Sequence, residues 1–248
     1  MAKSAVNRTR HHSPQLFHSR TKLKIGLVGG SFNPAHAGHM HVSLTAYHKL
    51  GLDQILWLVR PQNPLKSSAD MANLPERLAA ARDITATTPF IHVIAPEVRL
   101  PSNFTNETLK YLNETMPLAR LVWIMGADNL VQFKQWKRHQ DIIDLLPIAV
   151  IDRPGYSYQA ISAGRQLFTR RYAASQLRRR LVKTRQHMSG WCFIAGQRHC
   201  ASATDIRKHR DERQLHEDET QRLDTVSYTH LRAHETGRNL VCRLLLEK

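Results

Sequence analysis

Two histidines placed three residues apart, directly after a pair of glycines, form the pattern in this chain best suited to phosphate chemistry. Residues 29–39 read GGSFNPAHAGH and follow a short apolar run. Glycines at the end of a strand let a phosphate approach the backbone closely, because no Cβ is in the way. His36 and His39 would lie on one side of a first helical turn, beside its unpaired N–H groups and positive dipole end. The segment therefore predicts an anion site.

Other interpretations of this segment fit less well. It matches neither GxGxxG nor GxxxxGK, the usual dinucleotide and P-loop patterns. A zinc site built on His36, His39 and His41 would lack the i, i+4 spacing and adjacent glutamate of the zincin motif. We therefore expect no protein-held metal. A purely structural role, with both histidines capping a helix, stays open.

The elements around this segment predict an α/β fold, a parallel sheet flanked by helices in a single domain. Ligands of such sheets bind beyond the carboxyl ends of the strands. Strands are expected over 23–28, 54–59, 90–94, 121–125, 147–152 and 191–195, and helices over 38–50, 75–87, 105–115, 136–145 and 158–182.

Composition and charge narrow the choice of partners. The formal net charge is +16, which suggests phosphorylated small molecules or nucleic acid. No apolar run is long enough to span a bilayer, and no secretory signal is present, so we expect a cytoplasmic protein without a membrane partner. The three cysteines form no CxxC pair, and we expect buried thiols. No RNP, helix-turn-helix or zinc-finger pattern supports nucleic-acid binding.

The two ends of the chain are interpreted separately. Residues 1–21 are basic, polar and free of acids, which is compatible with a disordered arm. The expected domain covers 22–207, and 208–225 has no assigned structure. Residues 226–248 resemble the translation of a sequencing adapter and are interpreted as a non-native tail.

Two motifs together resemble a known family. The GGSFNPAHAGH segment resembles the (T/H)xGH signature of nucleotidyltransferases, and its exact form is similar to that of bacterial nicotinate-nucleotide adenylyltransferases. SATDIR at 202–207 resembles the SxTxIR element of the same family. The resemblance implies a Rossmann-like nucleotidyltransferase fold. It also implies transfer of the AMP part of ATP to nicotinate mononucleotide, with release of pyrophosphate and Mg²⁺ accompanying ATP.

The resemblance assigns roles to individual residues. It implies that His36, His39, Lys66 and Arg207 act on the phosphates, Lys66 from a PLK sequence where the family typically has Pro-His-Lys. Asn33, Thr105 and Trp136 would bind the acceptor, with Trp136 stacking on its pyridine ring. ATP would contact Gly29, Gly30, Ser31, Phe32, Asp128, Ser202, Thr204 and Ile206.

Alternatives remain at several of these positions. Lys66 could be a surface lysine, Thr105 a helix N-cap, and Trp136 a core residue. The acceptor could be nicotinamide mononucleotide or phosphopantetheine, and a basic nucleic-acid-binding protein is a remote alternative. The sequence leaves a homo-oligomer open.

Overall fold

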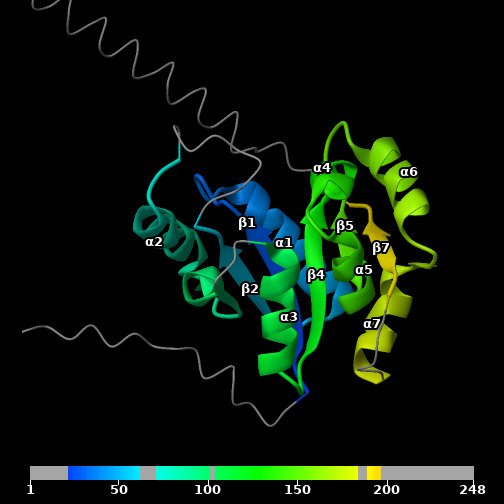
Figure 1. The fold of residues 1–248 in the computed structure, drawn as a ribbon, viewed down its shortest axis with the longest axis horizontal. Helices are drawn as coiled ribbons and strands as arrows, with labels where there is room; N and C mark the ends of the chain where they lie inside the picture. Colours follow the sequence, from blue (N-terminus) through cyan, green and yellow to red (C-terminus); the bar gives the residue numbers. More distant parts are fainter. Residues whose placement is uncertain (1–21, 62–70, 101–103, 184–188, 197–248) are drawn as a thin grey trace, which may run out of the picture. The chain divides into compact units, whose positions relative to one another are not determined.

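Seven parallel strands form one sheet, in the order β3-β2-β1-β4-β5-β7-β6 (Figure 1). The computed structural model describes residues 22–61, 71–100, 104–183 and 189–196. The strand order reverses between β1 and β4, which is where ligands bind in open sheets of this kind. The strands are β1 (Lys24–Gly30), β2 (Gln54–Val59), β3 (Ile91–Ile94), β4 (Arg120–Gly126), β5 (Ile148–Ile151), β6 (Arg171–Tyr172) and β7 (Trp191–Ile194).

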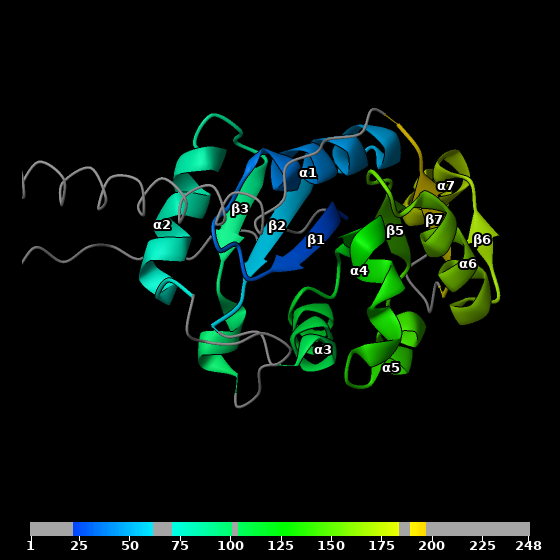
Figure 2. The same ribbon diagram turned by 90° about the horizontal axis from the view of Figure 1, so that it is seen from above.

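Helices cover both faces of the sheet, as Figure 2 shows. One face packs against α1 (Ala37–Leu50), α2 (Leu74–Thr85) and α7 (Ala174–Lys183). The other face packs against α3 (Thr105–Thr115), α4 (Ala127–Val131), α5 (His139–Leu145) and α6 (Ser157–Leu167). Two single turns of 3-10 helix complete the described elements, η2 (Pro96–Arg99) and η3 (Phe133–Gln135).

The core follows from the alternation of side chains along each strand. In β4, Leu121, Trp123 and Met125 face the layer of α3 to α6, whereas Val122 and Ile124 face the layer of α1, α2 and α7. Both sets are buried, so the strands of this sheet read as continuous apolar runs, as is usual for parallel sheets. The predicted α/β fold with a parallel sheet is confirmed.

The long helix expected over 158–182 is wrong. The chain leaves α6 at Phe168, forms the edge strand β6, and starts again as α7 at Ala174. Phe168 is buried and stacks on Trp191 with ring centroids 5.8 Å apart, while Arg171 and Tyr172 pair with β7. No proline or glycine lies between the two helices to mark the break in the sequence. The break arises from pairing with β7, which overrides the local preference of these residues for a helix.

The helix expected over 136–145 also begins later than predicted. The short helix α4 and the turn η3 precede it, and α5 starts only at His139. Trp136 therefore lies between two helical segments, and its backbone is extended, with φ −73° and ψ 134°. Its side chain packs against the core cluster on the side of α3 to α6.

Cys192 lies in β7 as a buried free thiol, in agreement with the expectation for the cysteines. Cys200 and Cys242 lie outside the described residues. Burial raises the pKa of the Cys192 thiol to about 12, against a partly compensating effect of Arg171. The thiol of an unfolded chain has a pKa of about 8.5. Raising the pH from there toward 12 therefore favours the unfolded chain, because only the folded thiol keeps its proton.

We expect Cys192 to be inert to thiol reagents in the folded protein. With Cys200 and Cys242 replaced by serine, titration with dithionitrobenzoate should detect no thiol in native buffer at neutral pH and one thiol per chain in denaturant. The reason is that the nucleophile is the thiolate, which burial disfavours. Rapid reaction of the native protein would contradict the placement of Cys192 in the core.

Candidate active site

The loop between β1 and α1 carries the glycines and both histidines of the predicted anion site. A Cβ added to Gly29 would lie 2.3 Å from Cη2 of Trp123 on the neighbouring strand. Glycine at this position is therefore required by packing of the indole, in addition to any approach of a phosphate. At Gly30 the nearest atom is Cε2 of Phe32 at 3.4 Å, an ordinary contact distance.

Phe32 forms the inner wall of this loop. Its backbone has φ 48°, a left-handed conformation that costs a bulky residue on the order of 1 kcal/mol. The residue is 1% exposed, and its ring stacks on Trp57 and lies tilted against His39, with centroid separations of 4.8 and 4.6 Å. These contacts offset the strain. The ring is part of the core, and the predicted contact of Phe32 with ATP stays a prediction.

His36 and His39 hydrogen-bond to the backbone that begins α1. The N–H of Gly38 donates to Nδ1 of His36 at 3.0 Å, and the N–H of His36 donates to Nδ1 of His39 at 3.2 Å. An N–H can donate only to an unprotonated nitrogen, so each neutral ring carries its proton on Nε2. The two rings lie with centroids 3.9 Å apart. Two Nε2–H donors thus stand side by side at a helix N-terminus.

The capping interpretation of the histidines is confirmed and is compatible with the phosphate interpretation. His36 is the N-cap of α1, and His39 completes a capping box with it. Both caps use Nδ1, which leaves the role of Nε2 unchanged. The same hydrogen bonds therefore stabilise the helix end and orient the donors.

A chain of hydrogen bonds ties this helix turn to the sheet. Nε1 of Trp57 in β2 donates to Oγ of Ser43 at 2.8 Å, and that hydroxyl donates to the carbonyl of His39 at 2.8 Å. Ser43 is fully buried, so the hydroxyl exchanges no bonds with water. The position of His39 is therefore fixed from β2 as well as from its own helix.

Arg77, on α2, links the loops that follow β1 and β2. The residue is 2% exposed, and its guanidinium donates to four backbone carbonyls, at 2.6 to 2.8 Å. Burial lowers the pKa of this guanidinium, although an arginine stays charged at neutral pH. The acceptors are the carbonyls of Ser31, Arg60, Pro61 and Ala72.

Asn33 joins the same structure from the other side of the loop. Its Oδ1 accepts the N–H of Ala72 at 3.2 Å, just before α2 begins. In this structure the side chain of Asn33 organises the loop. Its predicted contact with the acceptor stays a prediction.

Two of the three residues predicted to bind the acceptor, Thr105 and Trp136, belong to segments that meet at the start of α3. Thr105 is the first residue of this helix, and Phe104 is its N-cap, so the alternative that Thr105 caps the helix is wrong. Nζ of Lys137 lies 3.9 Å from the ring centroid of Phe104, which brings the neighbouring Trp136 to the same end of α3. Trp136 is half-buried against Phe133, with ring centroids 5.2 Å apart.

Asp128 follows β4 and pairs with Arg153, which follows β5. Nη1 of Arg153 lies 3.2 Å from Oδ2 of Asp128, and both side chains are partly exposed. The other oxygen, Oδ1, is buried and has no hydrogen-bond partner among the described residues. A buried acceptor of this kind suits the hydroxyl donors of a ribose.

Comparison with known proteins identifies the family. Residues 27–209 match the family model described as cytidylyltransferase-like. The chain is 44% identical over 187 residues to "Probable nicotinate-nucleotide adenylyltransferase" of Methylorubrum extorquens strain PA1, covering 75% of this chain and 99% of that protein. It is 51% identical over 138 residues to the protein of the same name from Parvibaculum lavamentivorans, covering 56% of this chain and 68% of that protein.

The chain belongs to the nicotinate-nucleotide adenylyltransferase family.

A solved structure of the family has the same fold. The nicotinic acid mononucleotide adenylyltransferase of Plasmodium falciparum, complexed with NaAD, superposes with a TM-score of 0.56 at 16% identity, covering 75% of this chain and 83% of that chain. At this identity the likeness concerns the fold alone.

The family's remaining signature positions lie outside the described residues. They are the predicted phosphate contacts Lys66, Ser202, Thr204, Ile206 and Arg207. Ser31 lies in the described loop, where its carbonyl accepts from Arg77. Apart from Asp128, which follows β4, the predicted site residues in the described part of the chain form two groups. One group lies in the loop after β1 and the other at the start of α3, and both lie at the carboxyl ends of the strands.

Sequence reasoning missed Arg77, Ser43 and Trp57, whose hydrogen bonds hold the site in place. A signal for Arg77 existed, since an arginine at an apolar helix position predicts a buried cation with a specific task.

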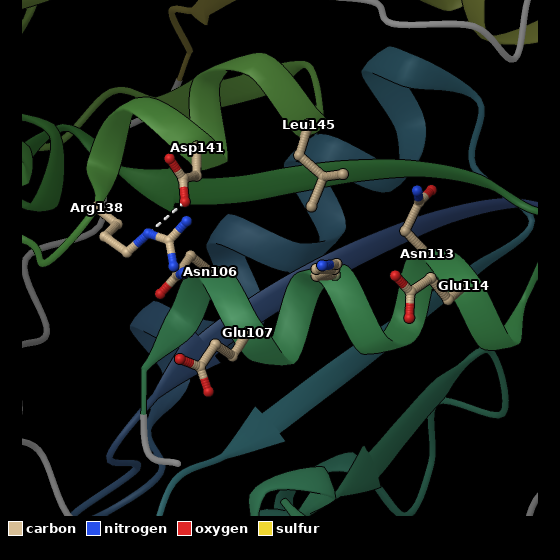
Figure 3. A pocket seen from close by; sticks show the side chains of 8 residues that line it. Asn106, Glu107, Asn113, Glu114, Arg138, Asp141 and Leu145 are labelled. Carbon is tan, nitrogen blue, oxygen red and sulfur yellow. Dashed lines mark ion pairs between the residues drawn. The ribbon is translucent and has the colours of Figure 1, made fainter. Parts of the chain in front are cut away.

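A separate cavity of about 390 Å³ lies between α3 and α5 (Figure 3). Its charges are mixed, and Arg138 pairs with Asp141 across its edge at 2.6 Å. Asn106, next to Thr105, lines it, but no predicted site residue does. The residues predicted to bind ATP and the acceptor lie elsewhere in the described chain or outside it.

Two further classes of site receive no support from the described residues. In that part of the chain no group of three or more His, Cys, Asp or Glu residues could hold a metal ion. None of the helices described has the length and apolar character that a membrane span requires.

We expect Arg77→Met to destabilise the protein by about 3 kcal/mol or more, because it leaves buried carbonyls without donors. Arg77→Lys, which keeps the charge but offers fewer directed donors, should lose less. Urea denaturation measures both. Arg82→Met on the exposed side of the same helix is the matched control and should stay within about 0.5 kcal/mol of the original chain. Equal effects at positions 77 and 82 would contradict the role of Arg77.

Proposed function

We propose that the chain transfers the adenylyl group of ATP to nicotinate mononucleotide, forming deamido-NAD and pyrophosphate. The observation that carries this proposal is the paired Nε2–H donors of His36 and His39 at the N-terminus of α1. Relatives that bear the name of this activity support the choice of reaction. The phosphate oxygen of the acceptor attacks the α-phosphorus of ATP, and the bond to the bridging oxygen of the β-phosphate breaks.

Catalysis in this proposal is positioning and charge stabilisation, and no side chain acts as a nucleophile. The two Nε2–H groups donate to the triphosphate oxygens as negative charge moves onto the leaving pyrophosphate. Neutral imidazoles are suited to this task, because they donate without having to transfer their protons. The N-terminus of α1 adds its positive dipole end.

Mg²⁺ enters as part of the ATP substrate. The described residues offer no carboxylate cluster for it, so its ligands would be phosphate oxygens and water, as is common for this ion. Bound there, it neutralises charge on the triphosphate. Lys66, Arg207, Ser202 and Thr204 are proposed to complete the phosphate site, as the resemblance implies.

The acceptor is proposed to lie between Trp136 and the first turn of α3. Trp136 offers a flat indole to the pyridine ring, and the backbone N–H groups of Thr105 and Asn106 have no carbonyl to bond within the helix. Asp128 is proposed to bind the ATP ribose through Oδ1, since Arg153 pairs with its other oxygen.

We also propose that the protein works in the cytoplasm on these two small substrates. The buried free thiol of Cys192 is compatible with a reducing compartment.

The reaction is tested by pyrophosphate release from ATP and Mg²⁺, with nicotinate mononucleotide and nicotinamide mononucleotide offered separately. We expect turnover with the nicotinate form to be preferred. Preference for the amide would retain the mechanism and overturn the substrate, and release with neither acceptor from folded protein would overturn the proposal.

A pair of substitutions at His39 separates its two nitrogens. Asparagine places an oxygen near the position of Nδ1, so His39→Asn keeps the acceptor for the His36 N–H and loses the Nε2–H donor. Glutamine places an amide N–H near Nε2, so His39→Gln keeps the donor and loses the cap. We expect His39→Asn to lower kcat about 100-fold or more with little change in stability.

For His39→Gln we expect the reverse order of effects. Stability should fall by about 0.5 to 1 kcal/mol through loss of the capping bond, while kcat falls less than in His39→Asn. Thermal or urea unfolding and pyrophosphate release measure the two quantities. If activity follows stability in both variants, His39 has only a structural role.

A further inference from the structure

Arg60 places a cation over the ring that the acceptor is proposed to use. It is the first residue after β2, and its Cζ lies 5.7 Å from the ring centroid of Trp136. The two residues are far apart in the sequence. Their contact links the end of β2 to the turn before α5.

The backbone of Arg60 is held on both sides. Its N–H donates to the carbonyl of Gly30 at 3.1 Å, and its carbonyl accepts from Nη1 of Arg77 at 2.6 Å. The side chain is half-buried. The direction in which this side chain leaves the sheet is therefore set by the same interactions that form the loop after β1.

A second cation, Lys137, lies over the ring of Phe104 and not over the indole. The N-terminus of α3 begins at the residue after Phe104, Thr105, and the dipole of that helix presents its positive end there. Of the two cations, Arg60 is the one placed over the indole of Trp136.

The two candidate acceptors differ in charge at this point. The ring nitrogen of a pyridine mononucleotide is quaternary and positive. In the nicotinate form the ring carboxylate balances that charge, whereas the nicotinamide form has an uncharged amide and leaves the ring a net cation. A guanidinium beside the ring attracts the first and repels the second.

We propose that Arg60 is a specificity residue that selects the carboxylate of the acceptor. This inference rests on the proposed function. When the pyridine ring stacks on Trp136, the guanidinium lies beside the ring and donates a charge-assisted hydrogen bond to its carboxylate. An amide offers the same cation no ion pair.

The test is the ratio of kcat/KM for nicotinate mononucleotide to kcat/KM for nicotinamide mononucleotide. Arg60→Gln should lower this ratio about tenfold or more, because it removes a charge-assisted hydrogen bond to one substrate and a repulsion against the other. Arg60→Lys keeps the charge and should retain part of the ratio. The KM for ATP should change little in either variant.

Lys137→Gln is the matched control, because it removes a cation from the same region that lies over Phe104 instead of Trp136. The ratio of the two kcat/KM values in Lys137→Gln should stay within about twofold of that in the original chain, as expected for a surface charge screened by water. Equal loss in Arg60→Gln and Lys137→Gln would replace the proposal by a general effect of surface charge. An unchanged ratio in Arg60→Gln would overturn it.

The outcomes separate this inference from the proposed function. If the original chain turns over neither acceptor, the proposed function fails. If it turns over the nicotinate form and Arg60→Gln keeps the same ratio, only the role of Arg60 fails. Arg60→Met replaces Arg60→Gln if the latter does not fold, since an unbranched apolar side chain packs against an indole without charge.

Discussion

The buried guanidinium of Arg77 is the interaction on which the geometry of the site depends. The loops after β1 and β2 contain backbone carbonyls that point away from any strand or helix partner. Buried carbonyls need donors, and water cannot supply them at this depth. One cation with five N–H donors satisfies several carbonyls at once, which a neutral side chain could not do. The loop that carries the histidines therefore has its shape because α2 places an arginine beneath it.

The histidines show that the fold and the site use the same hydrogen bonds. A helix N-terminus always leaves N–H groups without partners, and they are usually capped by serine, threonine, aspartate or asparagine. Here imidazoles take that task, through Nδ1 of His36 and His39. A hydroxyl or carboxylate cap would end at the backbone. An imidazole has a second nitrogen on its far side, so a capping imidazole can also carry the N–H donor that the proposed reaction requires.

Much of the fold could be predicted from the sequence, and the reasons are physical. Buried parallel strands are short apolar runs, and β1, β2 and β4 were placed to within two residues at each end. The break after α6 could not be predicted, because Arg171 and Tyr172 become a strand only through pairing with β7. The same limit applies to Trp136, whose position in a turn depends on the preceding short helix α4.

For the site, the sequence indicates the residues of the motifs but not the residues that hold them in place. Motifs name the residues predicted to meet the ligand, such as His36 and Asp128, because those positions would need particular chemical groups. The residues that hold them are not marked in this way. Ser43 and Trp57 form a buried hydrogen bond between α1 and β2, yet along the sequence they are an ordinary helix serine and an ordinary strand aromatic. Their role exists only in the folded chain.

Three arginines around the site differ in what their guanidinium groups contact. Arg77 is buried and directed at backbone carbonyls, so its charge is used to hold structure. Arg153 is paired with Asp128 and leaves one oxygen of that carboxylate for a ligand. Arg60 lies over an aromatic face, which holds a cation more weakly than a carboxylate does. It is the one of these three arginines that lies over the ring on which the acceptor is proposed to stack, which makes it the arginine proposed to recognise the substrate.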